Sequence, residues 1–110
     1  MGLASFAAHA ADCFDQAAHR YGVSAPLLRA IARVESSMNP AAVNNSHVQR
    51  TGTRDLGLMQ VNSSHLRTLA AYGIDERRLL DDACTNIHVG AWILASTFSR
   101  HGEGWEAVGA

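Results

Sequence analysis

The sequence predicts a mainly α protein with one helical domain and a small β-hairpin or irregular insert after its second helix. Its 110 residues suffice for one modest hydrophobic core and are too few for two, so we expect 1–110 to form one domain. Apolar residues recur at helical spacing in several stretches bounded by cap residues, glycine and proline. Between two such stretches, residues 41–53 show no periodicity and are rich in amide and hydroxyl groups, which is typical of turns.

Two helices are predicted before this insert. The first spans Asp12–Tyr21, and Gly22 is placed to end it. The second begins after Ser24, whose hydroxyl can accept a hydrogen bond from a free backbone N–H. Pro26 fits its first turn, where no N–H is required. It ends before Pro40, because the residue preceding a proline is driven out of the helical region.

The segment that follows the insert mixes apolar and polar positions. Leu56, Leu58 and Met59 are expected in the core, whereas Gln60 and Asn62 point elsewhere.

Two longer helices are predicted after this segment, with a short helical turn between them. The first spans 65–72, and either Ser63 or Ser64 can cap it. The second spans 83–101 and has a glycine at its centre, Gly90. Glycine lowers helix stability by about 1 kcal/mol relative to alanine, so we expect Gly90 to allow the close approach of another backbone.

Composition excludes two classes of protein. The formal net charge is −1, and the nine basic residues are scattered arginines, of which only Arg77 and Arg78 are adjacent. A nucleic-acid-binding protein would normally show a basic face, so we expect no nucleic-acid partner. No apolar run approaches the ~20 residues of a membrane span. Nothing in the pattern indicates an oligomer, and we expect a monomer.

The chain has two cysteines, Cys13 and Cys84, far apart in the sequence. They match no zinc or redox spacing, which leaves either two buried thiols or one disulfide. A bridge would close a loop of about 70 residues and stabilise the fold by roughly 4 kcal/mol in the chain-entropy model. It would also indicate an oxidising compartment.

The N-terminal residues are ambiguous. Met1–Ala10 is apolar and ends in Ala8-His9-Ala10, similar to a signal-peptidase site, but no basic region precedes it. We therefore expect 1–11 to be either the stub of a signal peptide or an added tail.

One acidic residue of the second helix is a candidate catalytic group. Leu27, Leu28, Ile31 and Val34 form a predicted apolar stripe, and Glu35 lies along its margin in the last turn. Partial burial and the negative end of the helix dipole would both raise the pKa of Glu35. An acid still protonated near neutral pH can serve as a general acid. The alternative is an ordinary solvated glutamate at a helix end.

Other chemistries find little support. The six histidines show no metal-ligand spacing, and no Gly-x-Ser-x-Gly sequence occurs, so we expect neither a metal nor a cofactor. The polar insert suits a ligand covered with hydroxyl and N-acetyl groups. An acid at the edge of such a cleft suits cleavage of a glycosidic bond, whose leaving oxygen must be protonated.

Three short motifs carry a family resemblance. They are Glu-Ser-Ser-Met-Asn-Pro at 35–40, Gly-Leu-Met-Gln-Val-Asn at 57–62 and Asn-Ile-His-Val-Gly-Ala at 86–91, followed by Leu94. In this order they resemble the lysozyme-like soluble lytic transglycosylases. More narrowly, the chain looks like the small specialised transglycosylases that accompany type III and type IV secretion systems. The resemblance spans about 12–110.

The resemblance implies an α+β, lysozyme-like fold and a reaction centred on one acid. Glu35 would protonate the oxygen between N-acetylmuramic acid and N-acetylglucosamine. It would then accept a proton from the muramoyl C6 hydroxyl, whose attack yields a 1,6-anhydro product. In this subgroup the cysteines matching Cys13 and Cys84 are typically bridged.

The resemblance also assigns roles to the residues around the acid. Ser36 would help to orient Glu35. Gln60 and Asn62 would line the glycan cleft, with Met59 at its wall. The implied partners are peptidoglycan strands and secretion-system components, the implied location is the periplasm, and the implied purpose is local opening of the cell wall.

Asp55 has two interpretations. In the secretion-associated subgroup an aspartate often stands two residues before the Gly-Leu-Met-Gln motif, where it could face Glu35 as a second carboxylate. Alternatively, it caps a turn or pairs with Arg54 or Arg50. The first interpretation allows a rival function, a lysozyme-type hydrolase using both carboxylates.

The sequence departs from the family pattern at its end. The family normally continues from a segment like Ala107–Ala110 into Tyr-Asn, with the tyrosine bonded to the catalytic glutamate. Here no such tyrosine follows, so we expect either a truncated C-terminus or a protein without that support. This departure allows a second rival function, a non-catalytic module that binds peptidoglycan during assembly.

Overall fold

The chain folds around one long helix. In the computed structural model, residues 13–101 are described. The predictions for 1–12 and for the final Ala-Val-Gly-Ala segment lie outside this range. The helical elements are the segment 13–21, α2 (Ala25–Ser36), α3 (Val48–Thr51), η1 (Ser63–His65), α4 (Leu66–Ala70), α5 (Glu76–Asp81) and α6 (Ala83–His101). The strands are β1 (Val43–Asn44), β2 (Asp55–Leu56) and β3 (Val61–Asn62).

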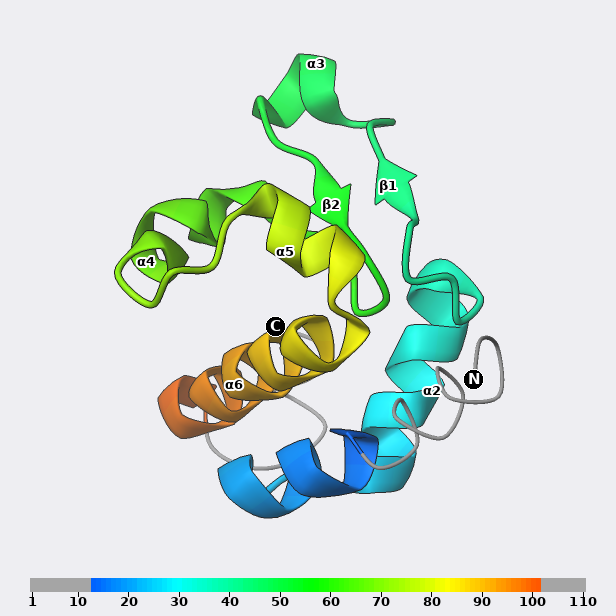
Figure 1. Ribbon diagram of the computed structural model, residues 1–110, viewed down its shortest axis with the longest axis vertical. Coiled ribbons are helices and arrows are strands. Elements are labelled where there is room, and N and C mark those ends of the chain that lie inside the picture. The colour runs from blue at the N-terminus through cyan, green and yellow to red at the C-terminus, as the bar shows by residue number, and fades with distance from the viewer. Residues whose placement is uncertain (1–12, 102–110) are drawn as a thin grey trace.

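The arrangement confirms a mainly α, lysozyme-like fold with a small sheet. Figure 1 shows α6 between α5 and the segment 13–21, with α2 alongside and the insert with α3 at the far end. α6 contacts α2, α5 and β3. The three strands are antiparallel in the order β1-β2-β3, with Asp55 opposite both Asn44 and Asn62. The segment expected as a hairpin or irregular loop therefore supplies β1 and the single turn α3.

One of the two predicted helix caps is found in the structure. Ser24 Oγ accepts from the backbone N of Leu27 at 3.2 Å and starts α2. The cap after β3 differs from the prediction, because Asn62 Oδ1 accepts from the N of Ser64 at 3.0 Å. Ser63 Oγ instead accepts from the N of Arg54 at 3.0 Å and so joins the ends of two strands.

The core lies where α2, α6, the segment 13–21 and the β2–β3 turn meet. Leu56, Leu58 and Met59 are buried, as predicted; the full set is Cys13, Phe14, Ala17, Ala18, Leu28, Ala32, Leu56, Leu58, Met59, Val61, Leu69, Leu79, Ile87, Val89 and Ala91. The predicted stripe of α2 is wrong at Val34, which is 82% exposed. Leu28 and Ala32 lie one helical turn apart and face the core, and at about 100° per residue Val34 points away from it.

A disulfide joins Cys13 to Cys84 with a Cα–Cα distance of 5.4 Å. It decides between the two alternatives that the sequence left open and ties the segment 13–21 to the first turn of α6. The bridge spans 71 residues, a loop for which the chain-entropy model gives roughly 4 kcal/mol of stabilisation. No helix within residues 13–101 has the length and hydropathy needed to cross a membrane.

Candidate active site

The three sequence motifs meet at the β2–β3 turn, residues 57–60. Ser36, at the end of α2, donates its hydroxyl to Leu58 O at 2.7 Å and lies 2.9 Å from Ala32 O. Asn86, near the start of α6, is fully buried, and its Oδ1 accepts from Met59 N at 2.7 Å. The first of these bonds joins residues that are 22 positions apart in the chain, and the second joins residues that are 27 positions apart.

The Asn86 amide satisfies three buried backbone groups at once. Besides the bond to Met59 N, its Nδ2 donates to Leu56 O at 2.9 Å and to Leu79 O at 3.0 Å. Because an unpaired buried backbone group costs about 1–3 kcal/mol, this side chain is a central part of the fold. It holds β2, the turn and α5 together.

Two glycines make room at this junction. Gly57 has a φ of +78°, and a Cβ there would lie 2.2 Å from Asn86 Nδ2. A Cβ at Gly90 would lie 2.8 Å from Met59 Cβ and Cγ. The expectation that Gly90 admits another backbone is therefore wrong in detail, because the group that approaches is the side chain of Met59.

Glu35 lies in the last turn of α2 and is exposed. The expectation that Glu35 is partly buried is therefore wrong. Just after Glu35 the chain leaves the helix through two consecutive left-handed residues, Ser37 (φ 54°) and Met38 (φ 63°). Their N–H groups donate to Arg33 O at 3.0 Å and Ala32 O at 3.3 Å, which ends α2 before Pro40 is reached.

The residues expected around the acid are bonded mainly to the turn. Ser36 bonds Leu58 and Ala32, so these contacts give it a role in holding the turn, and its orientation of Glu35 stays a prediction. Gln60 has a φ of +53°, and its Nε2 donates to Gly57 O at 3.0 Å and to Ala42 O at 3.2 Å. Met59 is 7% exposed and packs on Gly90 rather than lining an open wall.

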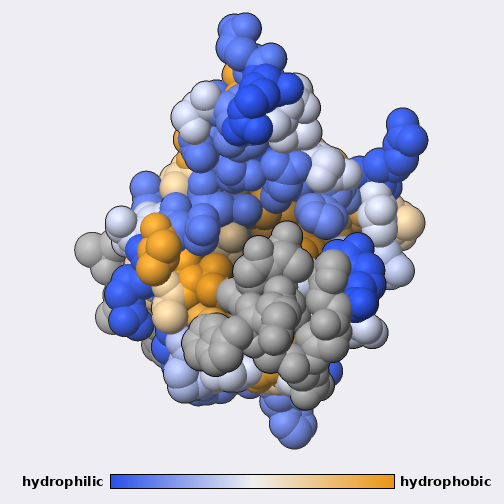
Figure 2. Space-filling model, turned by 180° about the vertical axis from the view of Figure 1, so that it is seen from behind, coloured by the Kyte–Doolittle hydropathy of each residue, from blue (hydrophilic) through white to orange (hydrophobic). Residues whose placement is uncertain are grey.

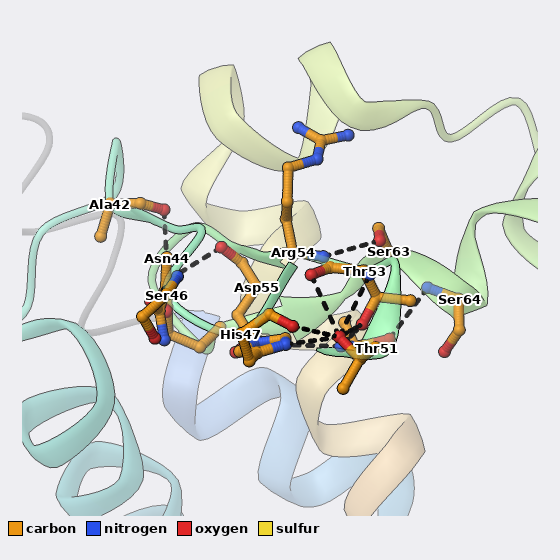
Figure 3. A network of polar contacts seen from close by, with 12 residues as sticks. Ala42, Asn44, Ser46, His47, Thr51, Thr53, Arg54, Asp55, Ser63 and Ser64 are labelled. Carbon is orange, nitrogen blue, oxygen red and sulfur yellow. Dashed lines mark hydrogen bonds and ion pairs between the residues drawn. The ribbon is translucent and has the colours of Figure 1, made fainter. Parts of the chain in front are cut away.

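Asp55 is held by two side chains. Its Oδ1 accepts from Asn62 Nδ2 at 2.9 Å, and its Oδ2 lies 2.8 Å from His47 Nε2. Figure 3 shows His47 and Thr51 of the insert close to Asp55 on β2. Asn62, expected to line the cleft, thus also supports this carboxylate.

Neither predicted arginine, Arg54 or Arg50, forms an ion pair with Asp55. Arg54 forms hydrogen bonds to both carboxylate oxygens of Glu76, one of them at 2.9 Å from its Nη1. Successive side chains of a strand point to opposite faces, so Arg54 points away from its neighbour Asp55. These hydrogen bonds lower the pKa of Glu76, helped by the charge of Arg54 and opposed by burial.

His47 is the residue that sequence reasoning missed. None of the three sequence motifs includes His47, which precedes Thr51 by four residues and Asp55 by eight. The spacing from His47 to Thr51 is that of neighbours on one helical turn. It is the only sequence signal we find for the contacts of His47.

The surface around the insert is polar, and the body beneath it is more apolar. Figure 2 shows hydrophilic residues over the projecting insert and hydrophobic residues exposed on the body below. Near Glu35, Val34 is 82% exposed and Met38 is 38% exposed. Such a surface suits a ligand with both hydroxyl groups and apolar ring faces.

A cavity of about 590 Å³ lies elsewhere, between the segment 13–21, α4 and α6. Tyr21, Tyr72, His88 and Trp92 contribute to its lining, and none of the predicted glycan-site residues does. His88 Nδ1 is buried without a hydrogen-bond partner in the described part of the chain. Burial lowers the pKa of His88, the charge of Arg20 lowers it further, and Asp82 opposes both.

A helix that carries an exposed glutamate in its last turn, a small antiparallel sheet and a long central helix are together consistent with a lysozyme-like domain. The sequence profile of the Transglycosylase SLT domain family matches residues 12–110. The chain therefore belongs to this family.

Several relatives are similar over most of this chain. Invasion protein IagB of Salmonella typhimurium is 46% identical over 100 residues, which is 91% of this chain and 61% of that protein. Protein IpgF of Shigella flexneri is 42% identical, covering 91% of this chain and 64% of its own length. X polypeptide of Escherichia coli K12 is 46% identical over 102 residues, or 93% and 59% of the two chains. The chain thus spans about three fifths of the length of these relatives.

Proposed function

We propose that this chain cleaves the β-1,4 bond between N-acetylmuramic acid and N-acetylglucosamine in peptidoglycan and forms a 1,6-anhydro product. The observation that supports this most directly is the junction at the β2–β3 turn. There Ser36 bonds the turn and fixes the end of α2 that bears Glu35. Membership of the Transglycosylase SLT domain family supports the same reaction class.

The proposed reaction uses Glu35 twice. Its carboxylic acid protonates the glycosidic oxygen as the bond from that oxygen to the muramoyl C1 breaks. The carboxylate so formed then takes the proton of the muramoyl C6 hydroxyl, whose oxygen bonds to C1. No water is consumed, and Glu35 returns to its starting form. An exposed position leaves the carboxyl accessible to a polymeric substrate.

Replacing the acid tests this proposal. Glu35→Gln keeps the shape of the side chain and removes the proton that is transferred, so we expect clearing of peptidoglycan suspensions to fall at least about 100-fold. The matched control is Glu76→Gln, which removes a carboxylate bonded to Arg54 and should retain most activity. Unchanged clearing by folded Glu35→Gln would exclude the acid role.

A hydrolytic reaction is the second candidate, because Asp55 is an ordered carboxylate held by Asn62 and His47. A hydrolase adds water at C1, whereas a transglycosylase does not. Mass analysis of the released muropeptides separates them, since 1,6-anhydro ends are lighter by one water than reducing ends. Glycan binding without any release would instead indicate a non-catalytic assembly module.

We further propose that the protein works as a monomer in the periplasm, opening the cell wall locally with secretion-system components. The Cys13–Cys84 disulfide supports an oxidising compartment, and one relative is named an invasion protein. Alkylation of free thiols in fractionated cells tests the location. A periplasmic, alkylation-resistant protein is expected, and a reduced cytoplasmic one would contradict the proposal.

A further inference from the structure

We propose that His47 is a positioning residue that holds the Asp55 carboxylate in one orientation, so that Asp55 acts as a fixed negative charge during glycan cleavage. The catalytic half of this statement rests on the proposed function, and the positioning half rests on geometry alone. Asp55 lies on β2, which runs directly into the turn whose Leu58 O accepts from Ser36, the neighbour of Glu35. Asp55 and Glu35 are therefore attached to the same rigid junction.

Donors from two elements hold the carboxylate. Asn62, on β3, lies opposite Asp55 and donates to its Oδ1 at 2.9 Å. His47, which belongs to the insert, places its Nε2 at 2.8 Å from Asp55 Oδ2. The side chains of His47 and Asp55 are only 17% and 23% exposed, so water competes weakly for their contact. With one donor on each oxygen, rotation of the carboxylate would break a hydrogen bond.

His47 is itself held by its own turn. Its Nδ1 lies 2.7 Å from Thr51 Oγ1, and that hydroxyl lies 3.0 Å from His47 O. An ionised carboxylate only accepts, so Nε2 must carry the hydrogen toward Asp55. Thr51 can donate to Nδ1 of the neutral ring or accept from the imidazolium. The bond to Asp55 is therefore compatible with both charge states of His47.

Polar contacts, rather than a buried apolar side chain, hold the insert in place. No residue in 41–53 is buried, so apolar packing does not hold this segment. Its order comes from polar contacts such as Ser46 N to Asn44 Oδ1 at 2.9 Å and Thr53 N to Thr51 Oγ1 at 3.2 Å. Among its side chains, His47 is the one that reaches the Asp55 carboxylate. This contact adds a side-chain link to the backbone links that β1 and Ala42 make with β2 and the turn.

This arrangement also indicates what Asp55 does. A carboxylate with a hydrogen bond on each oxygen is a weaker nucleophile than a free one, because both oxygens share their charge with donors. A preoriented charge can still stabilise positive charge that develops at C1 in an oxocarbenium-like transition state. His47 and Asn62 thus favour an electrostatic role for Asp55 over a covalent one.

The activity test compares His47→Leu, which removes the donor, with His47→Gln, which keeps an amide donor. On soluble glycan strands we expect His47→Leu to lower kcat about tenfold with KM within about twofold, because misplacement of a charge affects the transition state most. His47→Gln should recover most of kcat. In an Asp55→Ala background, His47→Leu should have no further effect. A loss in that background, or no recovery with glutamine, would show that His47 merely anchors the insert.

A second measurement does not depend on activity. In NMR spectra, the side-chain amide protons of Asn62 report its bonds to Asp55 Oδ1 at 2.9 Å and to Thr53 Oγ1 at 3.1 Å. We expect them to shift and exchange faster in His47→Leu, to stay near the wild-type positions in His47→Gln, and the Asn86 amide to remain unchanged as an internal control. Unaltered Asn62 signals in folded His47→Leu would overturn the positioning role. If the wild type cleaves no glycan, the proposed function fails, but this NMR measurement still tests whether His47 positions the Asp55 carboxylate.

Discussion

Asn86 and His47 each hold a neighbouring segment through hydrogen bonds from a polar side chain, but in very different surroundings. Asn86 is fully buried, and the backbone groups that it bonds belong to Leu56, Met59 and Leu79. His47 is partly exposed in an insert without a single buried residue, and its two ring contacts are with side chains.

The two residues illustrate the difference between buried hydrogen bonds and hydrogen bonds that water can reach. The three hydrogen bonds of Asn86 at the junction are buried, so water cannot readily replace a partner that is lost there. At the exposed contacts within the insert, such as Asn44 to Ser46, water can replace a lost partner, so a change there remains local. We therefore expect substitutions at the junction to reduce global stability and substitutions in the insert to act mainly on the site.

Asn86→Ala should show the largest effect on stability. It removes the buried side-chain partner of Leu56 O, Leu79 O and Met59 N, which is expected to lower the free energy of unfolding by roughly 5 kcal/mol. The control in the insert is Asn44→Ala, which removes an exposed contact to Ser46 N and should cost less than about 1 kcal/mol. Urea denaturation measures both, and similar losses would refute the distinction.

Gly57→Ala and Gly52→Ala form a matched pair with the next largest effect. Both glycines have positive φ, +78° and +73°, but only at Gly57 would a Cβ meet other atoms, Asn86 Nδ2 at 2.2 Å and Leu79 O at 2.9 Å. Backbone strain alone should cost about 1–2 kcal/mol at Gly52, whereas added overpacking should bring Gly57→Ala to roughly 4 kcal/mol. Equal shifts of the denaturation midpoint would contradict the close approach.

The pH dependence of stability gives the smallest expected effect. Because burial and Arg20 lower the pKa of His88 in the folded protein, the unfolded chain takes up a proton first as the pH falls below 6.5, its ordinary value. Stability should therefore decrease from that pH downward until the folded state is also protonated. His88→Gln should remove this slope relative to the wild type. Identical pH profiles of unfolding would show that His88 is not linked to folding.

Much of the fold could be predicted because its signals are local. Ser24 caps α2, Pro26 lies in its first turn, and the three hydrophobic residues of the turn segment are buried where expected. The order of the motifs was sufficient to recognise the family. The cap of the helix after β3 was missed, since Asn62 and Ser63 have nearly equal capping propensity and the strand geometry decides between them.

The candidate site was predicted less completely. Glu35 does lie at the end of α2, but the expectation that it and Val34 lie at a buried face was wrong. Periodicity gives the width of an apolar stripe only roughly, and the path of neighbouring elements decides which edge of the stripe is covered. Likewise, nothing in the sequence distinguishes His47 from Arg54 as the partner of Asp55.

The sequence by itself determined the helices outside the insert, most of their ends and the identity of the family. These depend on caps, prolines and spacings that act over about four residues. Only the tertiary structure decided that Ser36 bonds Leu58, that Asn86 bonds Leu56 and that His47 rather than an arginine bonds Asp55. The first two contacts span 22 and 30 residues, and a hydrogen bond at such a separation exists only where packing of the whole chain brings donor and acceptor together.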